Sequence, residues 1–313
     1  MATRVMVAGG GGFVGSHLCD ALLDDGYEVF CVDNFGSGRP WNVEHLLDHP
    51  RFTLQKADIR QPPALPPVDE IYHLASRASP KDFIDFSVRI SLTNTEGTRN
   101  LLDHTVACDA KMLFASTSEV CGDPEVHPQP ESYTSNVNIC GPRDCYDESK
   151  RFGETLTVAY EREYDLDVRT ARIFNTYGPR MRVNDGRVIP NFLSQAIRDE
   201  DLTVYGDGSQ TRSFCYVSDL LRGIRQVMSE DEMKGDVVNL GNEHEITIKQ
   251  LAEAVLRTYD AESEITYKSL PEDDPSRRRP DLSKAERVLD FEPTVKLETG
   301  LQKTIKYFEE QIW

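Results

Sequence analysis

The glycine-rich stretch AGGGGFVGSH, residues 8–17, constrains the fold more than any other part of the sequence. It directly follows the apolar run RVMVA, residues 4–8, and Gly9, Gly12 and Gly15 give it the spacing Gly-x-x-Gly-x-x-Gly. Glycines at this spacing allow a tight turn, a close approach of the backbone to a pyrophosphate, and close packing of the next helix on the strand. The helix that follows would offer free N–H groups and a positive dipole end to phosphates. The stretch therefore predicts a dinucleotide-binding turn.

Two aspartates follow the glycine-rich turn at the ends of the next predicted strands. Asp33 ends the second strand about 20 residues after Gly12, the spacing at which an acidic residue binds a ribose 2′-hydroxyl. A carboxylate there would repel a 2′-phosphate, which favours NAD over NADP. Asp58 closes the third strand, where it is placed to meet an adenine amino group. The alternatives are a plain α/β turn with a surface Asp33, and a solvated turn aspartate at residue 58.

Alternating strand and helix patterns in the first half predict an α/β fold, a doubly wound parallel sheet with a smaller C-terminal lobe. A chain of 313 residues suits one large core and a second lobe. We assign residues 1–175 to the dinucleotide-binding domain, to which later segments return, and 176–313 mainly to a substrate lobe. The expected helices are Phe13–Asp25, Arg89–Val106 and Tyr146–Glu163, the expected strands are 4–8, 28–32, 52–56, 70–75, 111–116 and 167–174, and a long polar loop spans residues 119–144.

Tyr146 and Lys150 stand four residues apart at the start of a predicted helix, in CYDESKR. Residues i and i+4 share one face of a helix, so both side chains can reach one point. A neighbouring ammonium and an oxidised nicotinamide ring would lower the pKa of the phenol, which is normally about 10. Such a tyrosine can take a proton from a sugar hydroxyl while a hydride leaves the same carbon. Alone the pair is a weak signal, but beside a dinucleotide loop it is a strong one.

Charge and cysteine content exclude several classes of protein. The net charge of −18 argues against a nucleic-acid partner, since a basic groove is needed to follow phosphates. Seven cysteines at scattered positions lack CxxC or zinc-like spacing, so we expect reduced thiols and no metal. No apolar run approaches the roughly 20 residues that cross a bilayer. These features predict a soluble, cytoplasmic protein without a membrane partner.

With these motifs in place, the chain resembles the extended short-chain dehydrogenase/reductase family, and within it the UDP-glucuronate decarboxylases. The likeness runs nearly end to end, and many segments in register make it far more specific than any one motif. The segments that carry it are GGFVGSHL, VDNF, YHLAS, NTEGT, STSEV, GDPEVHPQ, GPRDCYDESKR, ARIFNTYGPRM, NDGRV, LTVYGDGSQTRSFCYVSDL, NLGN and RRRPD.

The resemblance implies oxidation of UDP-glucuronate at C4, loss of carbon dioxide, and re-reduction to UDP-xylose, with NAD regenerated. In the related 4,6-dehydratases an Asp stands at the position of Ser118, and it protonates the departing C6 hydroxyl. Ser118 cannot act as that acid. Thr117 would orient or relay the proton handled by Tyr146, Glu119 would repel the sugar carboxylate or position a water, and Arg278 would contact that carboxylate or a proton-donating water.

The resemblance also implies two sets of binding residues. Arg187 and Arg212 are the candidates for the nucleotide diphosphate, because a guanidinium binds phosphate through two parallel hydrogen bonds. The nucleotide sugar would be bound by Glu119, Asn175, Arg187, Asn191, Tyr205, Gln210, Arg212 and Arg278. NAD would be bound by Gly9, Gly12, Phe13, Val14, Gly15, Asp33, Asn34, Ser37, Gly38, Asp58, Ile59, Leu74, Ala75, Ser76, Thr93, Tyr146, Lys150 and Thr176.

Other functions and an assembly state follow from the same resemblance. One alternative is another NAD-recycling nucleotide-sugar enzyme, a 4-epimerase or a 4,6-dehydratase. A second, from another class, is a non-catalytic NAD-binding module, against which intact Tyr146 and Lys150 argue. Relatives commonly form homodimers through helices that include the one bearing Tyr146, so we expect a homodimer.

The strong negative charge has two explanations, simple solubility or adaptation to concentrated salt. Only 11 of the 35 basic residues are Lys. If the protein is adapted to salt, transfer into dilute buffer should unfold it. The Debye length is then about 10 Å or more, so repulsion between neighbouring carboxylates is no longer screened. Circular dichroism at decreasing salt concentrations measures this, and full stability in dilute buffer would contradict the salt explanation.

Overall fold

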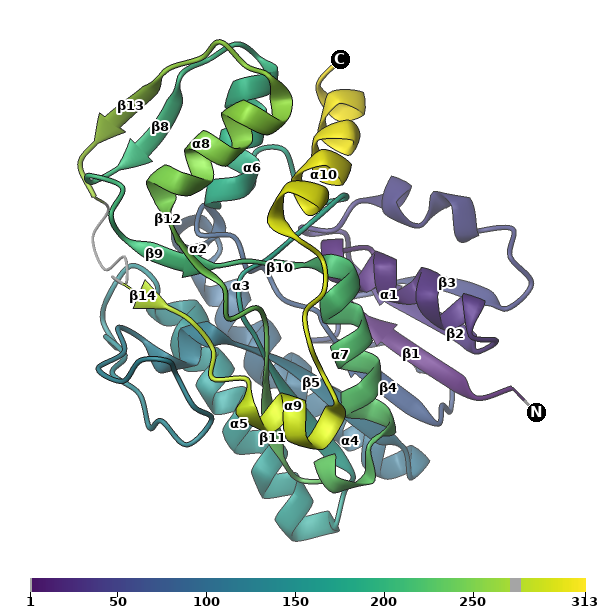
Figure 1. Ribbon diagram of the computed structural model, residues 1–313. Helices are drawn as coiled ribbons and strands as arrows, with labels where there is room; N and C mark the ends of the chain where they lie inside the picture. The colour runs from purple at the N-terminus through teal and green to yellow at the C-terminus, as the bar shows by residue number, and fades with distance from the viewer. Residues whose placement is uncertain (1, 271–276) are drawn as a thin grey trace.

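The computed structural model describes residues 2–270 and 277–313 and contains a central sheet of seven parallel strands (Figure 1). The order across the sheet is β11-β6-β5-β4-β1-β2-β3, and every neighbouring pair is parallel. This is the doubly wound arrangement that the sequence predicts. Its strands are β1 (Arg4–Ala8), β2 (Glu28–Asp33), β3 (Phe52–Lys56), β4 (Glu70–His73), β5 (Lys111–Thr117), β6 (Val168–Ile173) and β11 (Val237–Leu240).

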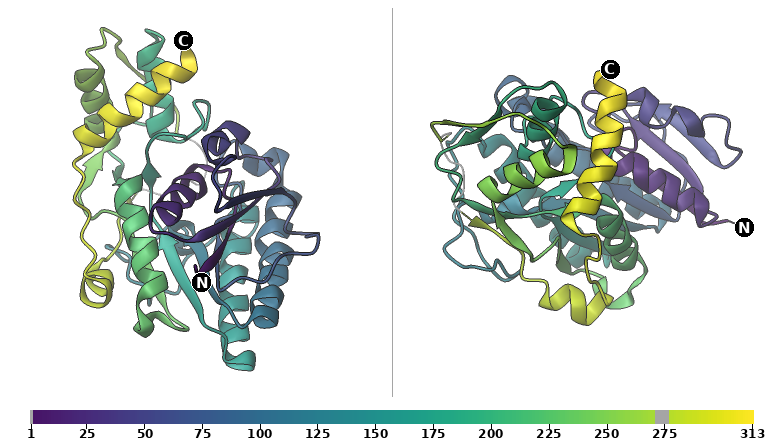
Figure 2. Two further views of the ribbon diagram at one scale, coloured as in Figure 1. Left: turned by 90° about the vertical axis from the view of Figure 1, so that its right-hand side faces the viewer. Right: turned by 45° about the horizontal axis from the view of Figure 1, so that its top comes forward.

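Helices cover both faces of the sheet because its strands are apolar on both sides. On β1, Val5 and Val7 pack into one apolar cluster while Met6 and Ala8 pack into another, as expected from the two-residue period of a strand. The first cluster contains residues of α1 (Phe13–Asp24) and α7 (Val217–Ser229). The second contains residues of α4 (Thr98–Cys108), and α5 (Asp144–Tyr164) packs on β5 and β6 beside α4. Figure 2 shows the sheet edge-on between these layers.

The later part of the chain builds a second lobe beyond the carboxyl ends of the strands (Figures 1 and 2). Helices α6, α8 and α10 pack on one another, and α6 and α8 also pack on β8, which pairs with β13. A second small sheet has the order β12-β9-β14, and β7 pairs with β10. The elements are β7 (Thr176–Tyr177), α6 (Val188–Ile197), β8 (Leu202–Tyr205), β9 (Thr211–Ser213), β10 (Cys215–Tyr216), β12 (Glu245–Thr247), α8 (Ile248–Tyr259), β13 (Ile265–Lys268), β14 (Arg277–Arg278) and α10 (Leu297–Ile312). Helix α9 (Ser283–Leu289) returns to the central sheet and packs on β11 and α7.

The first half of the chain follows the predicted element order closely. The six strands expected there exist, and each differs from its prediction by at most two residues at either end. The helix predicted at Arg89–Val106 is longer and interrupted: α3 (Ser87–Leu92) passes through a π-helical turn, Thr93–Gly97, into α4, and it is preceded by the short α2 (Asp82–Asp85). The loop after β5 begins with a short 3-10 turn, Ser118–Cys121. Within residues 2–270 and 277–313, no helix combines the length and apolarity needed to cross a bilayer.

The strand order places the site. The chain leaves β1 toward β2 and β3 on one side and later toward β4 and β5 on the other, so the order reverses between β1 and β4. In open α/β sheets a crevice opens at the carboxyl ends of the strands at such a point, and ligands bind there. The glycine-rich turn, which directly follows β1, therefore borders this crevice.

One arginine that the sequence analysis did not single out joins β6 to α7. Arg169 is 1% exposed, and its Nη1 donates to the carbonyl oxygens of Val227, Met228 and Glu230 at 2.8, 2.6 and 2.7 Å. Its Nε and Nη2 donate to the carboxylate of Asp167 at 2.7 and 3.0 Å. The last carbonyl groups of a helix have no partner within the helix, so this guanidinium satisfies the end of α7.

We expect Arg169→Met to lower the free energy of unfolding by about 3 kcal/mol, because it leaves buried carbonyl groups without donors. Urea denaturation measures the change. Arg162→Met, at an exposed position on α5, removes the same charge and serves as the control. A loss no larger than that of the control would contradict this assignment.

Candidate active site

The glycine-rich turn lies so close to its neighbours that side chains are excluded. Gly9 has a φ of +87°, and a Cβ built on it would lie 2.6 Å from the amide nitrogen of Ala75 after β4. A Cβ on Gly15 would lie 2.2 Å from the carbonyl oxygen of Gly9. The turn therefore exposes bare backbone and the N-terminus of α1 to the crevice, as a bound pyrophosphate requires.

A groove of about 300 Å³ runs along the carboxyl ends of β1 to β4, and we call it the adenosine groove after the part of NAD that is expected there. Asp33 ends β2 there, and its carboxylate accepts the backbone N–H groups of Gly11 at 2.9 Å and Phe35 at 2.7 Å. Burial raises the pKa of Asp33, and these two hydrogen bonds, which lower the pKa, offset that rise only in part. Of the residues predicted to bind NAD, the groove is lined by Gly9, Gly12, Asp33, Asn34, Ser37, Gly38, Asp58, Ile59, Leu74, Ala75, Ser76 and Thr93.

Asp58 lines this groove but already has partners. Its carboxylate accepts from Arg60 Nε at 3.0 Å, from Arg60 Nη2 at 2.7 Å and from Asn34 Nδ2 at 3.1 Å. The hydrogen bonds from Arg60 lower the pKa of Asp58 to about 2. An adenine amino group would therefore meet a carboxylate whose position is already fixed by a guanidinium.

A second cavity of about 200 Å³ continues from the groove and contains Tyr146 and Lys150. Both side chains come from the first turns of α5, four residues apart as predicted, and both are buried. The Tyr146 ring stacks on Phe83 with centroids 5.1 Å apart. Lys150 Nζ donates to the carbonyl oxygen of Ala115 at 2.7 Å. The remaining predicted NAD-binding residues, Phe13, Val14, Gly15 and Thr176, line this same cavity.

Burial controls the titration of Tyr146 in the polypeptide alone. A lowered pKa was expected from a neighbouring ammonium together with an oxidised nicotinamide ring, but without the ring burial raises the pKa of Tyr146, and a hydrogen bond with Thr117 offsets this only in part. Burial also lowers the pKa of Lys150 to about 7. The pKa of the phenol is raised because burial disfavours the charged phenolate. The lowered pKa expected with NAD bound stays a prediction.

Glu119 lies between two arginines at the end of β5. Its carboxylate accepts from Arg143 Nη2 at 2.5 Å and from Arg278 Nη1 and Nη2 at 2.7 and 2.8 Å. Burial raises the pKa of Glu119, but the charges of Arg278 and Arg143 outweigh it, so the net shift is downward. The like-charge repulsion that the sequence suggested between Glu119 and a substrate carboxylate is therefore weakened.

Arg143 was not among the predicted site residues. It directly precedes α5 and stands three positions before Tyr146. That spacing places it near Tyr146, but its partner Glu119 lies 24 residues away and is revealed only by the fold. Ser118, by contrast, was predicted, and it lies buried at the end of β5 beside Thr117 and lines the cavity of Tyr146.

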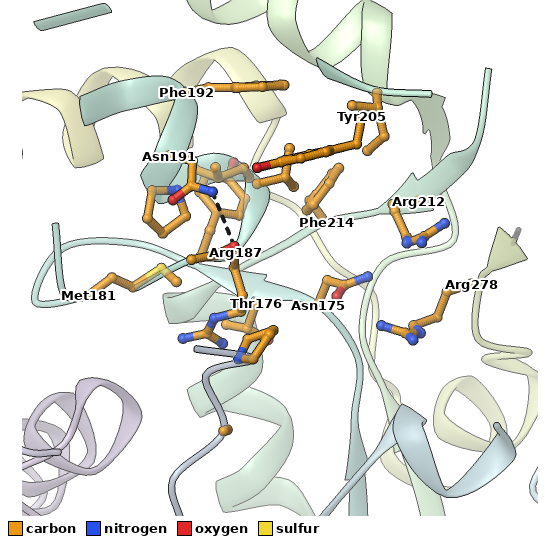
Figure 3. A pocket seen from close by; sticks show the side chains of 18 of the residues that line it. Asn175, Thr176, Met181, Arg187, Asn191, Phe192, Tyr205, Arg212, Phe214 and Arg278 are labelled. Carbon is orange, nitrogen blue, oxygen red and sulfur yellow. Dashed lines mark hydrogen bonds between the residues drawn. The ribbon is translucent and has the colours of Figure 1, made fainter. Parts of the chain in front are cut away.

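A third cavity, of about 340 Å³, lies between the sheet and the second lobe (Figure 3). Arg212 comes from β9 and Arg278 from β14, and the register of these parallel strands places the two directly opposite each other. Arg187 is held by Asp185 through hydrogen bonds of 2.5 and 3.1 Å, and Asn191 Nδ2 donates to the carbonyl oxygen of Gly186 at 3.1 Å. The cavity brings together the whole predicted substrate set: Glu119, Asn175, Arg187, Asn191, Tyr205, Gln210, Arg212 and Arg278.

The cavity of Tyr146 and the cavity of the second lobe share Glu119, Asn175, Thr176 and Arg187 among their lining residues. The buried Nδ2 of Asn175 has no hydrogen-bond partner within the described part of the protein. A donor without a partner is costly when buried, so it favours a bound ligand at this junction. The arrangement suits a dinucleotide and a second phosphate-bearing ligand that meet at Tyr146.

Comparisons with known proteins agree with this geometry. Residues 5–241 match the model of the NAD dependent epimerase/dehydratase family. The chain is 50% identical to UDP-glucuronic acid decarboxylase 1 of Xenopus tropicalis over 99% of its own length and 73% of the relative's. It is 49% identical to UDP-glucuronic acid decarboxylase 4 of Arabidopsis thaliana over 99% of its own length and 69% of the relative's.

A solved structure of similar shape is UDP-glucuronic acid 4-epimerase from Bacillus cereus, in complex with UDP-glucuronic acid and NAD. The two chains superpose with a TM-score of 0.89 over 98% of this chain and 99% of that one, at 28% identity. The fold thus accommodates both ligands in that neighbour.

The lowered pKa of Lys150 predicts a pH-dependent cost to folding. Unfolded Lys150 keeps its proton up to 10.5, whereas the folded protein releases it near 7. Between these values the unfolded state binds more protons, so this residue makes wild-type stability rise with pH. Lys150→Met removes the cost, and the stability of the variant relative to wild type should be greatest below about pH 7 and should shrink toward pH 10.

Urea denaturation of both proteins at about pH 6.5 and about pH 9.5 checks this. Lys306→Met, an exposed substitution on α10, is the control. A stability difference between Lys150→Met and wild type that does not change with pH would contradict the burial of a titrating ammonium.

Proposed function

This chain belongs to the NAD dependent epimerase/dehydratase family, and we propose that within this family it is a UDP-glucuronate decarboxylase that forms UDP-xylose. The observation that carries the proposal is the end of β5, where Thr117, Ser118 and Glu119 face the cavity of Tyr146. Ser118 stands where a dehydratase would need a carboxylic acid, so elimination of water has no proton donor at this position. Glu119 with its two arginines lies where the sugar carboxylate would sit.

The groove and the cavity of Tyr146 together would hold the cofactor. NAD, when bound, supplies a hydride acceptor for C4 of the sugar, a positive ring beside the phenol, and the return of the hydride at the end. Tyr146 takes the proton of the C4 hydroxyl. Thr117 is hydrogen-bonded to Tyr146 and orients its phenol group. Lys150 lies one helical turn away and holds the ribose next to the nicotinamide.

Decarboxylation follows from the ketone at C4. The bond between C5 and the carboxylate breaks, carbon dioxide leaves, and the electron pair passes into an enolate on the oxygen at C4. Protonated Tyr146 and Thr117 stabilise that oxygen by hydrogen bonds. A water contacted by Arg278 would donate a proton to C5. Return of the hydride to C4, with return of the proton from Tyr146 to the oxygen at C4, would then complete UDP-xylose.

The group of Arg143, Glu119 and Arg278 determines how tightly the sugar carboxylate is held. Two guanidiniums and one carboxylate leave a net positive charge, which attracts the substrate carboxylate. Glu119 occupies donors of both arginines at 2.5 to 2.8 Å. Without it, those donors would stabilise the charged ground state and oppose the loss of carbon dioxide, because only interactions stronger in the transition state accelerate a reaction. In this proposal Glu119 limits that stabilisation.

The proposal also covers the domain organisation, the assembly state and the location of the protein. We propose that residues 1–175, with α7, β11 and α9, form the NAD-binding domain, and that 176–313 mainly bind the nucleotide sugar. Exposed apolar side chains on α2, α3 and α5, namely Ile84, Val88, Phe152 and Val158, support a homodimer, which light scattering would test.

All seven cysteines are free thiols, which supports a cytoplasmic location, and cell fractionation would test that location.

The test supplies the purified protein with NAD and UDP-glucuronate and weighs the nucleotide product. We expect a product lighter than the substrate by one carbon dioxide, whereas an epimerase leaves the mass unchanged and a dehydratase removes water. Tyr146→Phe should lower kcat by about 10²–10⁴-fold, the usual contribution of a general acid–base group. Tyr164→Phe, at the exposed end of the same helix, is the matched control. An unchanged product mass would overturn the proposal in favour of epimerisation.

A further inference from the structure

Arg77 makes an unusual set of contacts just beyond β4. One arm of its guanidinium, Nη2, donates to the carbonyl oxygen of Gly36, and the other, Nη1, donates to the carboxylate of Asp82 at 3.0 Å. The guanidinium carbon lies 3.9 Å from the centroid of the Phe86 ring. The side chain is 16% exposed, so it is packed into the structure and not free in solvent.

These contacts cross the binding crevice. Gly36 follows β2 and Arg77 follows β4, and β1 lies between these strands in the sheet. The loop after β1 is the glycine-rich turn, so the link from Arg77 to Gly36 spans the mouth of the cofactor crevice. The adenosine groove and the cavity of Tyr146 both border Ser37 and Ser76, the neighbours of the two linked residues. The link therefore lies where the two halves of the cofactor site join.

We propose that Arg77 is a positioning residue that closes this crevice over the dinucleotide and slows its release. This inference rests on the proposed function, because the proposed function identifies NAD as the dinucleotide that binds in the crevice. Arg77 is not a catalytic residue, because the cavity that contains Tyr146 is lined by other side chains. Its contribution is to the time for which the cofactor remains bound.

The link is fixed at both of its ends. The loop on the Gly36 side is held in shape by Asp33 Oδ1, which accepts from Phe35 N at 2.7 Å, and by Asn34 Oδ1, which accepts from Gly36 N at 2.7 Å. On the other side, Asp82 also accepts from Arg182 Nη2 at 3.0 Å. Arg182 belongs to the segment between β7 and α6, so Asp82 ties the link to the second lobe.

The chemistry of an arginine side chain suits this link. Its planar guanidinium carries several N–H donors, so it can donate to a carbonyl and a carboxylate at once while its face stacks on a ring.

The proposed reaction requires that the cofactor remain bound throughout one turnover. The hydride removed from C4 is returned only after carbon dioxide has left, so the reduced cofactor must stay bound meanwhile. Its loss would strand the sugar as a ketone.

The experiment measures cofactor release directly. Protein loaded with NADH is mixed with excess NAD in a stopped-flow instrument, and the fall of bound NADH fluorescence gives the dissociation rate. We expect Arg77→Met to raise this rate about tenfold or more, the factor that corresponds to one lost hydrogen bond to a charged group. Arg77→Lys should also raise it, because an ammonium keeps the charge but has all its donors on one nitrogen and lacks the planar face that stacks on Phe86.

Two measurements keep the result interpretable. Arg99→Met, at an exposed position on α4, removes the same charge far from the link and should release NADH at the wild-type rate. A melting temperature of Arg77→Met equal to that of Arg99→Met shows that the fold is intact. NADH release from Arg77→Met at the wild-type rate would overturn this inference alone. Failure of the wild-type protein to bind NADH at all would overturn both the inference and the proposed function.

Discussion

The contact between the glycine-rich turn and the end of β4 is the constraint on which the rest of the site depends. Gly9 and Gly15 leave no room for a Cβ, so β1, the start of α1 and the backbone after β4 approach one another closely. That approach creates the crevice at the reversal of strand order. The adenosine groove, the position of Tyr146 and the link from Arg77 to Gly36 are all arranged around it.

Long-range pairing completes the reactive end of the crevice. Glu119 comes from the first half of the chain, yet one of its two arginines, Arg278, is 159 residues away. Strand β14 pairs with β9, which sets Arg278 beside Arg212 and directs both toward the end of β5. A buried carboxylate is costly unless its charge is compensated, so the second lobe and the sheet stabilise each other at this point.

Much of this could be predicted from the sequence because it depends on local patterns. The glycine spacing, Asp33 at the end of β2, and Tyr146 with Lys150 on one helical face follow from short-range rules, and the resemblance to relatives placed Glu119, Arg212 and Arg278 in one site. The pKa of Tyr146 could not be predicted, because it depends on how deeply α5 is buried. Arg143 and Arg77 were not predicted either: their partners, Glu119 for one and Gly36 with Asp82 for the other, are revealed only by the folded chain.

The shared lining of the cavity of Tyr146 and the cavity of the second lobe has a consequence for engineering this protein. Glu119, Asn175, Thr176 and Arg187 line both the cavity proposed for the cofactor and the cavity proposed for the sugar. Substitutions at these positions cannot change sugar specificity alone, because each substitution also changes the shape of the proposed cofactor site. Evolution toward new sugars therefore has more freedom at Tyr205, Gln210 and Asn191, which line only the sugar side.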